Sequence, residues 1–120
     1  MNRQIKKTKF GLIQIDRVTY KHDVIIGLDG EVKKRKKKLS KAIYSTSHKV
    51  SLDEAKYVYE EGVKQLIIGS GQYGVLYLSD DAKQFFHKMD IEVEIYPTPE
   101  AIQVWNNTKR KVIGLFHVTC

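Results

Sequence analysis

Residues 69–74 form a glycine-rich segment that could bring backbone amides to a phosphate group. Their order, Gly-Ser-Gly-Gln-Tyr-Gly, matches the spacing of the dinucleotide-binding fingerprint, and a short apolar run precedes them. That fingerprint requires a helix that begins at the glycines, whereas residues 75–78 predict a strand and the first helix signal follows at Ser79. We therefore favour a glycine-rich turn, which permits positive φ angles and close packing, over a dinucleotide site.

The segment His117-Val118-Thr119-Cys120 places an imidazole and a thiol close together in the chain. If the strand predicted over 112–118 is parallel to the one over 65–68, this segment reaches the same sheet edge as the glycine-rich segment. Loop amides, a helix start and an imidazole would meet there and would suit an anion. The residues of this candidate anion site are Gly69, Ser70, Gly71, Gln72, Tyr73, Thr98 and His117. The alternative is that His117 is a hydrogen-bonded strand histidine and Cys120 a buried or frayed terminal residue.

Nucleophilic and metal chemistry have weaker support in the sequence. Cys120 could act as a nucleophile with His117 or His48 as its base, but no third group that would orient the histidine is evident. The pair His117 and Cys120 offers two metal ligands at most, and the remaining histidines, His22, His48 and His87, lie in separate segments. We therefore predict no catalytic residues, no metal and no cofactor.

The formal net charge of +7 is unevenly distributed along the chain. Residues 1–50 contain 14 Lys and Arg against 4 Asp and Glu, whereas residues 51–120 contain 7 against 10. The excess is concentrated in a six-cation run, Lys33, Lys34, Arg35, Lys36, Lys37 and Lys38. Such a run could bind nucleic acid non-specifically through phosphates, although no aromatic residues are interleaved with it. The alternative is a solvated hairpin arm whose charges keep an edge strand from pairing.

The N-terminal third of the chain predicts antiparallel strands. Residues 10–15 and 18–20 are rich in β-forming side chains, and Asp16-Arg17 between them suits a tight turn. A second hairpin is predicted from residues 23–28 and from Glu31 onward, with Asp29-Gly30 as a type I′ turn. The six-cation run therefore begins on the return arm of this hairpin.

Three helices are predicted from their capping signals. A capping box at Ser51 and Glu54 begins a helix that ends near Gly62. The other two helices are predicted over about 80–89 and about 99–107. Short apolar runs predict strands over 65–68, 75–78, 91–96 and 112–118. Strands that alternate with helices indicate a sheet with parallel pairs, so the predicted fold class is α/β with an antiparallel N-terminal part.

The length of 120 residues fits a single domain, residues 1–120, with a core that needs no disulfide or metal. The one cysteine, Cys120, cannot form an internal disulfide, which suits a reducing compartment. No apolar stretch approaches the ~20 residues that a membrane span needs, and the basic N-terminus lacks the apolar region of a secretory signal. We therefore expect a cytoplasmic protein without a membrane partner.

Five segments of the chain resemble the Mth938-domain family, once described as a domain of unknown function. They are residues 66–76 around the glycines, Pro97-Thr-Pro-Glu-Ala-Ile102, the closing Gly114-Leu-Phe-His-Val-Thr-Cys120, Thr46-Ser-His-Lys49, and the basic arm that holds the six-cation run. The resemblance covers nearly the whole chain. It implies a layered fold in which a central mixed sheet has helices on one side and a small antiparallel N-terminal sheet on the other. It also adds His48 to the candidate anion site.

The resemblance implies a function of limited detail. Eukaryotic members of the family are linked to adipocyte differentiation and to assembly of respiratory complex I, and neither role is an established catalytic activity. The mitochondrial members lack the His-x-Thr-Cys ending of this chain, so complex I assembly is not carried over. We expect a non-enzymatic binding or protein-interaction module, with a protein partner or self-association. The alternatives are a small anionic ligand or nucleotide, with or without catalysis, at the glycine-loop edge, and non-specific nucleic-acid binding through the six-cation run.

Overall fold

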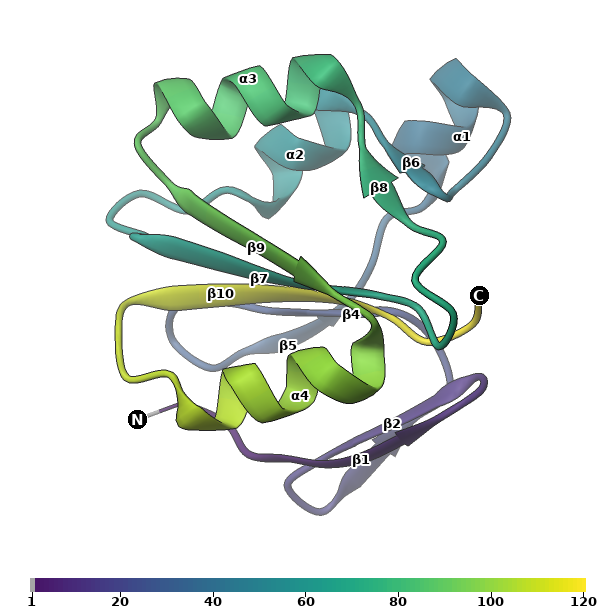
Figure 1. Ribbon diagram of the computed structural model, residues 1–120, viewed down its shortest axis with the longest axis vertical. Coiled ribbons are helices and arrows are strands. Elements are labelled where there is room, and N and C mark those ends of the chain that lie inside the picture. Colours follow the sequence, from purple (N-terminus) through teal and green to yellow (C-terminus); the bar gives the residue numbers. More distant parts are fainter. Residues whose placement is uncertain (1) are drawn as a thin grey trace.

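The computed structural model describes residues 2–120 and centres on a mixed sheet of five strands (Figure 1). The strands lie in the order β5 (Val32–Lys34), β4 (Val24–Ile26), β10 (Val112–His117), β7 (Gln65–Ser70) and β9 (Glu92–Tyr96). β10, β7 and β9 are parallel to one another, whereas β4 is antiparallel to both of its neighbours. Because β10 is parallel to β7, the two strands end at the same edge of the sheet, as the candidate anion site requires. His117 pairs with Ser70 at these carboxyl ends.

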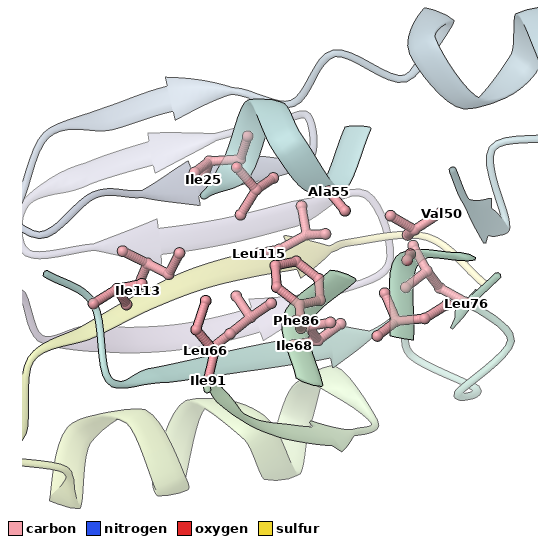
Figure 2. Packing of buried hydrophobic residues seen from close by; sticks show 14 residues of the cluster. Ile25, Val50, Ala55, Leu66, Ile68, Leu76, Phe86, Ile91, Ile113 and Leu115 are labelled. Atoms are coloured by element: carbon pink, nitrogen blue, oxygen red, sulfur yellow. The ribbon is translucent and has the colours of Figure 1, made fainter. Parts of the chain in front are cut away.

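Two helices, α2 (Leu52–Val58) and α3 (Asp80–Lys88), cover one face of this sheet, and α1 (Lys38–Tyr44) lies beside α2. A short parallel pair, β6 (Lys49–Val50) and β8 (Tyr77–Leu78), belongs to the same layer. Figure 2 shows the apolar side chains that fill the space between sheet and helices. The buried members of this cluster are Ile25, Val50, Ala55, Val58, Val63, Leu66, Ile68, Leu76, Leu78, Ala82, Phe86, Ile91, Ile113 and Leu115. Alternate residues of the same strands point to the other face, where they form a second core.

The opposite face carries α4 (Thr98–Asn107) and a three-stranded antiparallel sheet of β1 (Ile5–Lys9), β2 (Leu12–Ile15) and β3 (Val18–Tyr20). Trp105 of α4 packs edge-on against Phe116 of β10, with ring centroids 5.7 Å apart. The predicted fold class is confirmed. α4 lies beside the small sheet because the crossovers from β7 to β9 and from β9 to β10 run in opposite directions across the sheet. Right-handed crossovers then place their helices on opposite faces.

The three helices predicted from capping signals are present as α2, α3 and α4. α2 differs from its prediction in the capping contacts and in its last residue. Ser51 Oγ accepts a hydrogen bond from Glu54 N at 3.1 Å, as predicted. The second half of the capping box is wrong, because the Glu54 side chain binds Arg35 instead of the helix start. α2 also ends at Val58, before the predicted end near Gly62, because the next residue is extended. The limits of α3 and α4 lie within one residue of the prediction.

Three elements, β1, β6 and α1, were not predicted, and one predicted turn is wrong. β6 is only two residues long. Three of the five residues of β1 are lysines, so the sequence lacks the alternation of apolar and polar residues that predicts a strand. α1 has neither a side-chain cap nor an acidic first turn, so the sequence offers no start signal there. A type I′ turn at Asp29-Gly30 requires positive φ at both residues, but only Gly30 has one, with φ of 85°. The hairpin is closed further back, where Gly27 N donates to Glu31 O at 2.9 Å.

Candidate functional site

Backbone hydrogen bonds join the glycine-rich segment to Thr119 and Cys120. Gln72 N donates to Thr119 O at 2.7 Å, and Tyr73 N and Val75 N donate to Cys120 O at 2.9 and 3.3 Å. Gln72 and Tyr73 belong to the glycine-rich segment, whose amides the sequence predicts as hydrogen-bond donors to an anion. In the structure both amides already donate to carbonyl groups of the same chain. The structure therefore brings the predicted residues to one edge but leaves these donors without capacity for a phosphate.

Thr98 joins the glycine-rich segment to the last strand. Its hydroxyl donates to His117 O at 2.6 Å and accepts from Gly71 N at 2.9 Å, and its own N–H donates to Gly71 O at 2.9 Å. The N-cap of α4 is Pro97, so the helix begins at Thr98, one residue before its predicted start. Gly69 and Ser70 are buried within β7. A ligand could not reach the start of α4 without breaking these bonds.

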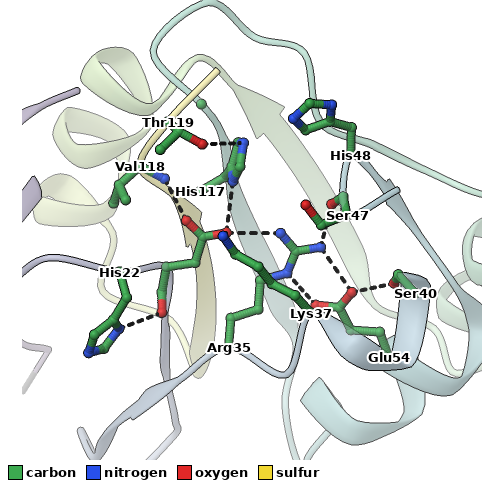
Figure 3. Close-up of polar contacts among 12 residues, drawn as sticks. His22, Arg35, Lys37, Ser40, Ser47, His48, Glu54, His117, Val118 and Thr119 are labelled. Carbon is green, nitrogen blue, oxygen red and sulfur yellow. Dashed lines mark hydrogen bonds and ion pairs between the residues drawn. The ribbon is translucent and has the colours of Figure 1, made fainter. Parts of the chain in front are cut away.

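His117 is held by Asp23, a carboxylate that sequence reasoning did not connect with it. Asp23 Oδ2 lies 2.7 Å from His117 Nδ1 (Figure 3). Because an ionised carboxylate only accepts hydrogen bonds, Nδ1 carries a proton. The other ring nitrogen, Nε2, lies 3.3 Å from Thr119 Oγ1. An acid, an imidazole and a hydroxyl in this order resemble the groups that activate a nucleophile. The hydroxyl is that of Thr119 rather than the thiol of Cys120, and the nearby loop amides are already occupied, so they cannot stabilise an oxyanion.

Asp23 also anchors a buried network of charged side chains that extends to α2 (Figure 3). Arg35 Nη1 donates to Asp23 Oδ2 at 2.9 Å, and Arg35 Nε and Nη2 donate to the two oxygens of Glu54 at 2.5 and 3.0 Å. Ser40 of α1 donates to Glu54 Oε1. The three charged side chains are at most 1% exposed. Every charge in the network therefore has a partner, and the network ties α1 and α2 to the hairpin of β4 and β5.

The network changes the protonation equilibria of its members. Burial tends to raise the pKa of the Asp23 carboxyl, but hydrogen bonds from His117, Val118 N and Arg35, together with the charge of His117, outweigh burial and lower this pKa to about 2. Burial tends to lower the pKa of Arg35, but Glu54 and Asp23 raise it by more. Asp23 and Arg35 are therefore both charged across the physiological pH range.

Acid is expected to weaken the folded state through Asp23. A carboxyl whose pKa is lower in the folded chain stabilises the fold fully above its unfolded pKa, and this stabilisation is lost as the pH falls from 3.8 towards 2. The shift corresponds to roughly 2 kcal/mol of unfolding free energy at neutral pH. Carbon NMR of the side-chain carboxyls measures the midpoint directly, and in Asp23→Asn the loss of stability over this interval should be smaller. A midpoint for Asp23 at 3.8 would contradict the assignment.

His48 lies beside His117, so the structure brings together the two histidines of the predicted site. Their ring centroids are 5.4 Å apart with an interplanar angle of 72°, and His48 is half-buried (Figure 3). Burial lowers the pKa of His48, and the positive charges of His117, Arg35 and Lys37 lower it further. The negative charge of Asp23 acts in the opposite direction and raises this pKa, so the charged groups around His48 partly offset one another.

The six-cation run does not form one continuous surface. Arg35 points into the buried network, and Lys37 Nζ lies 3.8 Å from a carboxylate of that network. Lys33 and Lys36 place their ammonium groups over the ring of Tyr57, at 5.1 and 4.7 Å from its centroid. Repulsion within the run is thus relieved by buried carboxylates and by an aromatic ring that lies far away in the sequence.

Large apolar side chains are exposed around the glycine-rich segment. We define the aromatic patch as the neighbouring rings of Phe10 and Tyr73 together with Val75 and Tyr77, which follow Tyr73 at alternate positions along the chain. Each of the four is at least 43% exposed. Tyr73 is 76% exposed and Phe10 is 59% exposed, and their ring centroids lie 6.3 Å apart. Phe10 belongs to the turn between β1 and β2, so the patch joins distant parts of the chain. Tyr73 is the member of the predicted site that lies on this accessible surface.

Sequence reasoning missed Asp23, Arg35 and Glu54 as a unit. The predicted hairpin could have indicated that Asp23 and Arg35 are close together, because Asp23 begins its outgoing arm and Arg35 lies on its return arm. In the structure Arg35 N donates to Asp23 O at 3.0 Å, which extends the ladder of β4 and β5 by one bond. An Asp and an Arg opposite each other beside a wholly apolar strand indicate a buried ion pair.

Other kinds of site have less support in the part of the chain that the structure describes. Over residues 2–120, no group of three or more His, Cys, Asp or Glu side chains could hold a metal ion. None of the helices described there combines the length and the apolar character that a membrane crossing requires. A cleft of about 720 Å³ lies away from the glycine-rich segment, near the start of β10, and is lined by Gly62, Thr108 and Lys111 among others.

The fold and this edge define a small mixed-sheet α/β domain whose last strand is tied by a buried Asp23–His117 pair. The chain belongs to the family described as a protein of unknown function (DUF498/DUF598), which matches residues 5–117. It is similar to the conserved hypothetical protein PH1505 from Pyrococcus horikoshii OT3, with 34% identity over 98% of this chain and 99% of that chain, and a TM-score of 0.89. It is also similar to the solved structure named MT938, with 31% identity over 98% of this chain and 99% of that chain, and a TM-score of 0.83.

A more distant structure shares the fold. It is a Mth938-like domain from Bordetella pertussis, which is 15% identical over 97% of this chain and 85% of that chain, with a TM-score of 0.63. The resemblance to the Mth938-domain family is therefore confirmed. The family is one of unknown function, so the function of this chain must be argued from its own surface.

Proposed function

We propose that this protein is a binding module that recognises a protein partner through the aromatic patch. The observation that carries the proposal is the exposure of Tyr73 and Phe10, two neighbouring aromatic rings, on the surface of a small domain. Contiguous exposed apolar side chains mark interaction sites, and tyrosine is enriched among the residues that dominate binding energy. Covering these rings would remove apolar surface from water, which favours association.

The patch is held in place before a partner arrives. Gln72 Nε2 donates to Thr8 Oγ1 at 3.0 Å, which links the glycine-rich segment to β1. Gly11 N donates to Val118 O at 2.8 Å, which links the β1–β2 turn to the end of β10. A pre-organised surface loses little conformational freedom on binding, so more of the interaction energy contributes to affinity.

The charges around the patch favour an acidic partner. Lys9 directly precedes Phe10, Lys49 pairs with Tyr77 across β6 and β8, and the whole chain carries a formal net charge of +7. Two copies joined through this patch would bring these cations together, which disfavours self-association. The proposed partner is therefore a protein segment that presents apolar side chains flanked by Asp or Glu.

Peptides selected from a random displayed library against the wild-type protein test this proposal. Enriched peptides should combine aromatic or aliphatic residues with Asp or Glu, and their addition should shift the amide NMR signals of residue 10 and residues 73–77. Tyr73→Ala should weaken binding at least about tenfold, because it removes the most exposed ring of the patch. Val18→Ala is the matched control, since Val18 is 51% exposed on β3 outside the patch.

Three results would contradict the proposal. One is a selection that enriches no peptide, or only peptides without acidic residues. Another is binding that Tyr73→Ala leaves unchanged or that Val18→Ala weakens equally. The third is an increase in molecular mass with concentration in sedimentation equilibrium that Tyr73→Ala abolishes, since the occupant of the patch would then be a second copy of the chain.

A further inference from the structure

A second surface is formed by the lysines of the six-cation run that face no carboxylate. We call these residues, Lys33, Lys34, Lys36 and Lys38, the lysine surface. Lys33 and Lys36 form its centre because both lie against Tyr57, whereas Lys34 follows Lys33 on β5 and points to the other face of that strand. Among residues 2–120, the ion pairs within 4.0 Å that involve the run are those of Arg35 and Lys37. Lys34, Lys36 and Lys38 are exposed, and Lys33 is half-buried. The lysine surface therefore carries positive charge that the chain itself does not neutralise.

Arg35 and Tyr57 arrange this surface. The Arg35 side chain is turned inward to its two carboxylates, while its neighbours Lys34 and Lys36 are exposed to solvent. Lys33 and Lys36 converge on one side chain, the ring of Tyr57, at 5.1 and 4.7 Å from its centroid. A cation–π contact restrains an ammonium group without cancelling its charge. Two ammonium groups are thus held close together, and each retains its capacity to donate hydrogen bonds.

We propose that the lysine surface binds the phosphate backbone of nucleic acid without regard to sequence. Four unpaired ammonium groups within six consecutive residues are a dense charge, and a duplex presents one phosphate charge in about every 1.7 Å of its axis. Binding would release the counterions condensed on the backbone, which supplies favourable free energy. An acidic protein segment offers no such condensed layer, so it gains less from the same lysines. This surface is separate from the aromatic patch, and the proposal is independent of the one above.

Fluorescence anisotropy with a labelled mixed-sequence DNA duplex of about 20 base pairs tests this inference over about 50 to 200 mM salt. The affinity should fall steeply with salt and should not depend on sequence. The double variant Lys33→Gln/Lys36→Gln should weaken binding about tenfold at low salt and reduce the salt slope by about 2, since each lost phosphate contact contributes about 0.9. Lys6→Gln/Lys7→Gln is the matched control, because it removes the same charge from exposed positions of β1 on the opposite layer.

The control and a competitor give the outcomes that would overturn the inference. If the two double variants weaken DNA binding equally, the net charge of the protein alone accounts for the binding and the lysine surface is not the binding site. Competition by polyglutamate as strong as that by unlabelled duplex would assign the surface to an acidic protein. Absence of binding at the lowest salt would also overturn it. Both double variants change exposed or half-buried lysines, so their far-ultraviolet circular dichroism should match that of the wild type.

Discussion

Replacing Arg35 with methionine is expected to lower the free energy of unfolding by about 3–5 kcal/mol. Arg35→Met keeps a long side chain but leaves the carboxylates of Asp23 and Glu54 buried without the cation that they share. Removing one partner of a buried ion pair is costly because the remaining charge is neither solvated nor paired. Equilibrium unfolding in urea, followed by tryptophan fluorescence from the buried Trp105, measures this loss.

Two further variants separate charge from packing in this network. Arg110→Met breaks an exposed ion pair with Glu92 and should cost less than about 1 kcal/mol. Adding Glu54→Gln to Arg35→Met removes one of the two stranded carboxylates, so it should restore part of the lost stability. If the double variant is no more stable than Arg35→Met, the loss comes from packing and the electrostatic explanation is wrong.

Gly71→Ala is expected to destabilise the protein by about 3 kcal/mol and to release the last residues from the glycine-rich segment. Gly71 has φ of +102°, which side chains rarely adopt. A Cβ atom there would clash with the backbone of Cys120 and would lie 2.8 Å from the ring of His117. The chain would have to move these groups, so the amides of Gln72 and Tyr73 should exchange with solvent faster in hydrogen-exchange NMR.

Gly62→Ala is the matched control for this clash. Gly62 has a similar φ of +92°, but a Cβ atom there would meet nothing within 4 Å. Its cost should therefore be limited to the backbone conformation, about 1–2 kcal/mol. Equal losses in the two variants would show that backbone strain alone is responsible and that contact with the end of the chain contributes nothing at Gly71.

The parts of the fold that depend on local signals could be predicted from the sequence. Ser51 and Ser79 cap α2 and α3 as predicted because a hydroxyl before a helix binds an amide only three residues away. The alternation of strands with helices indicated parallel pairs but left the direction of β10 open, and the structure shows that β10 is parallel to β7. α1 could not be predicted, since it begins at a run of cations without a capping side chain and is tied to α2 by tertiary contacts.

The candidate site was harder to predict, because its contacts join residues that are far apart in sequence. The glycine-rich segment, Thr98 and His117 do meet at one edge, as the parallel strands required. No local pattern could show that the end of the chain would occupy the loop amides, or that Asp23 would bind His117 across 94 residues. The exposure of Tyr73 was equally hidden, since an aromatic residue in a glycine-rich turn can be buried or exposed.

The position of β10 in the sheet has a consequence for the order in which this protein can fold during synthesis. β10 follows every other strand of the sheet along the chain, yet it lies between β4 and β7 and joins the two halves of the central sheet. Until it emerges from the ribosome, the β4–β5 hairpin and the β7–β9 pair each expose an unpaired inner edge, and Asp23 lacks its bond from Val118 N. Such edges favour pairing with other chains. The nascent chain is therefore most prone to aggregation in the interval before β10 is made.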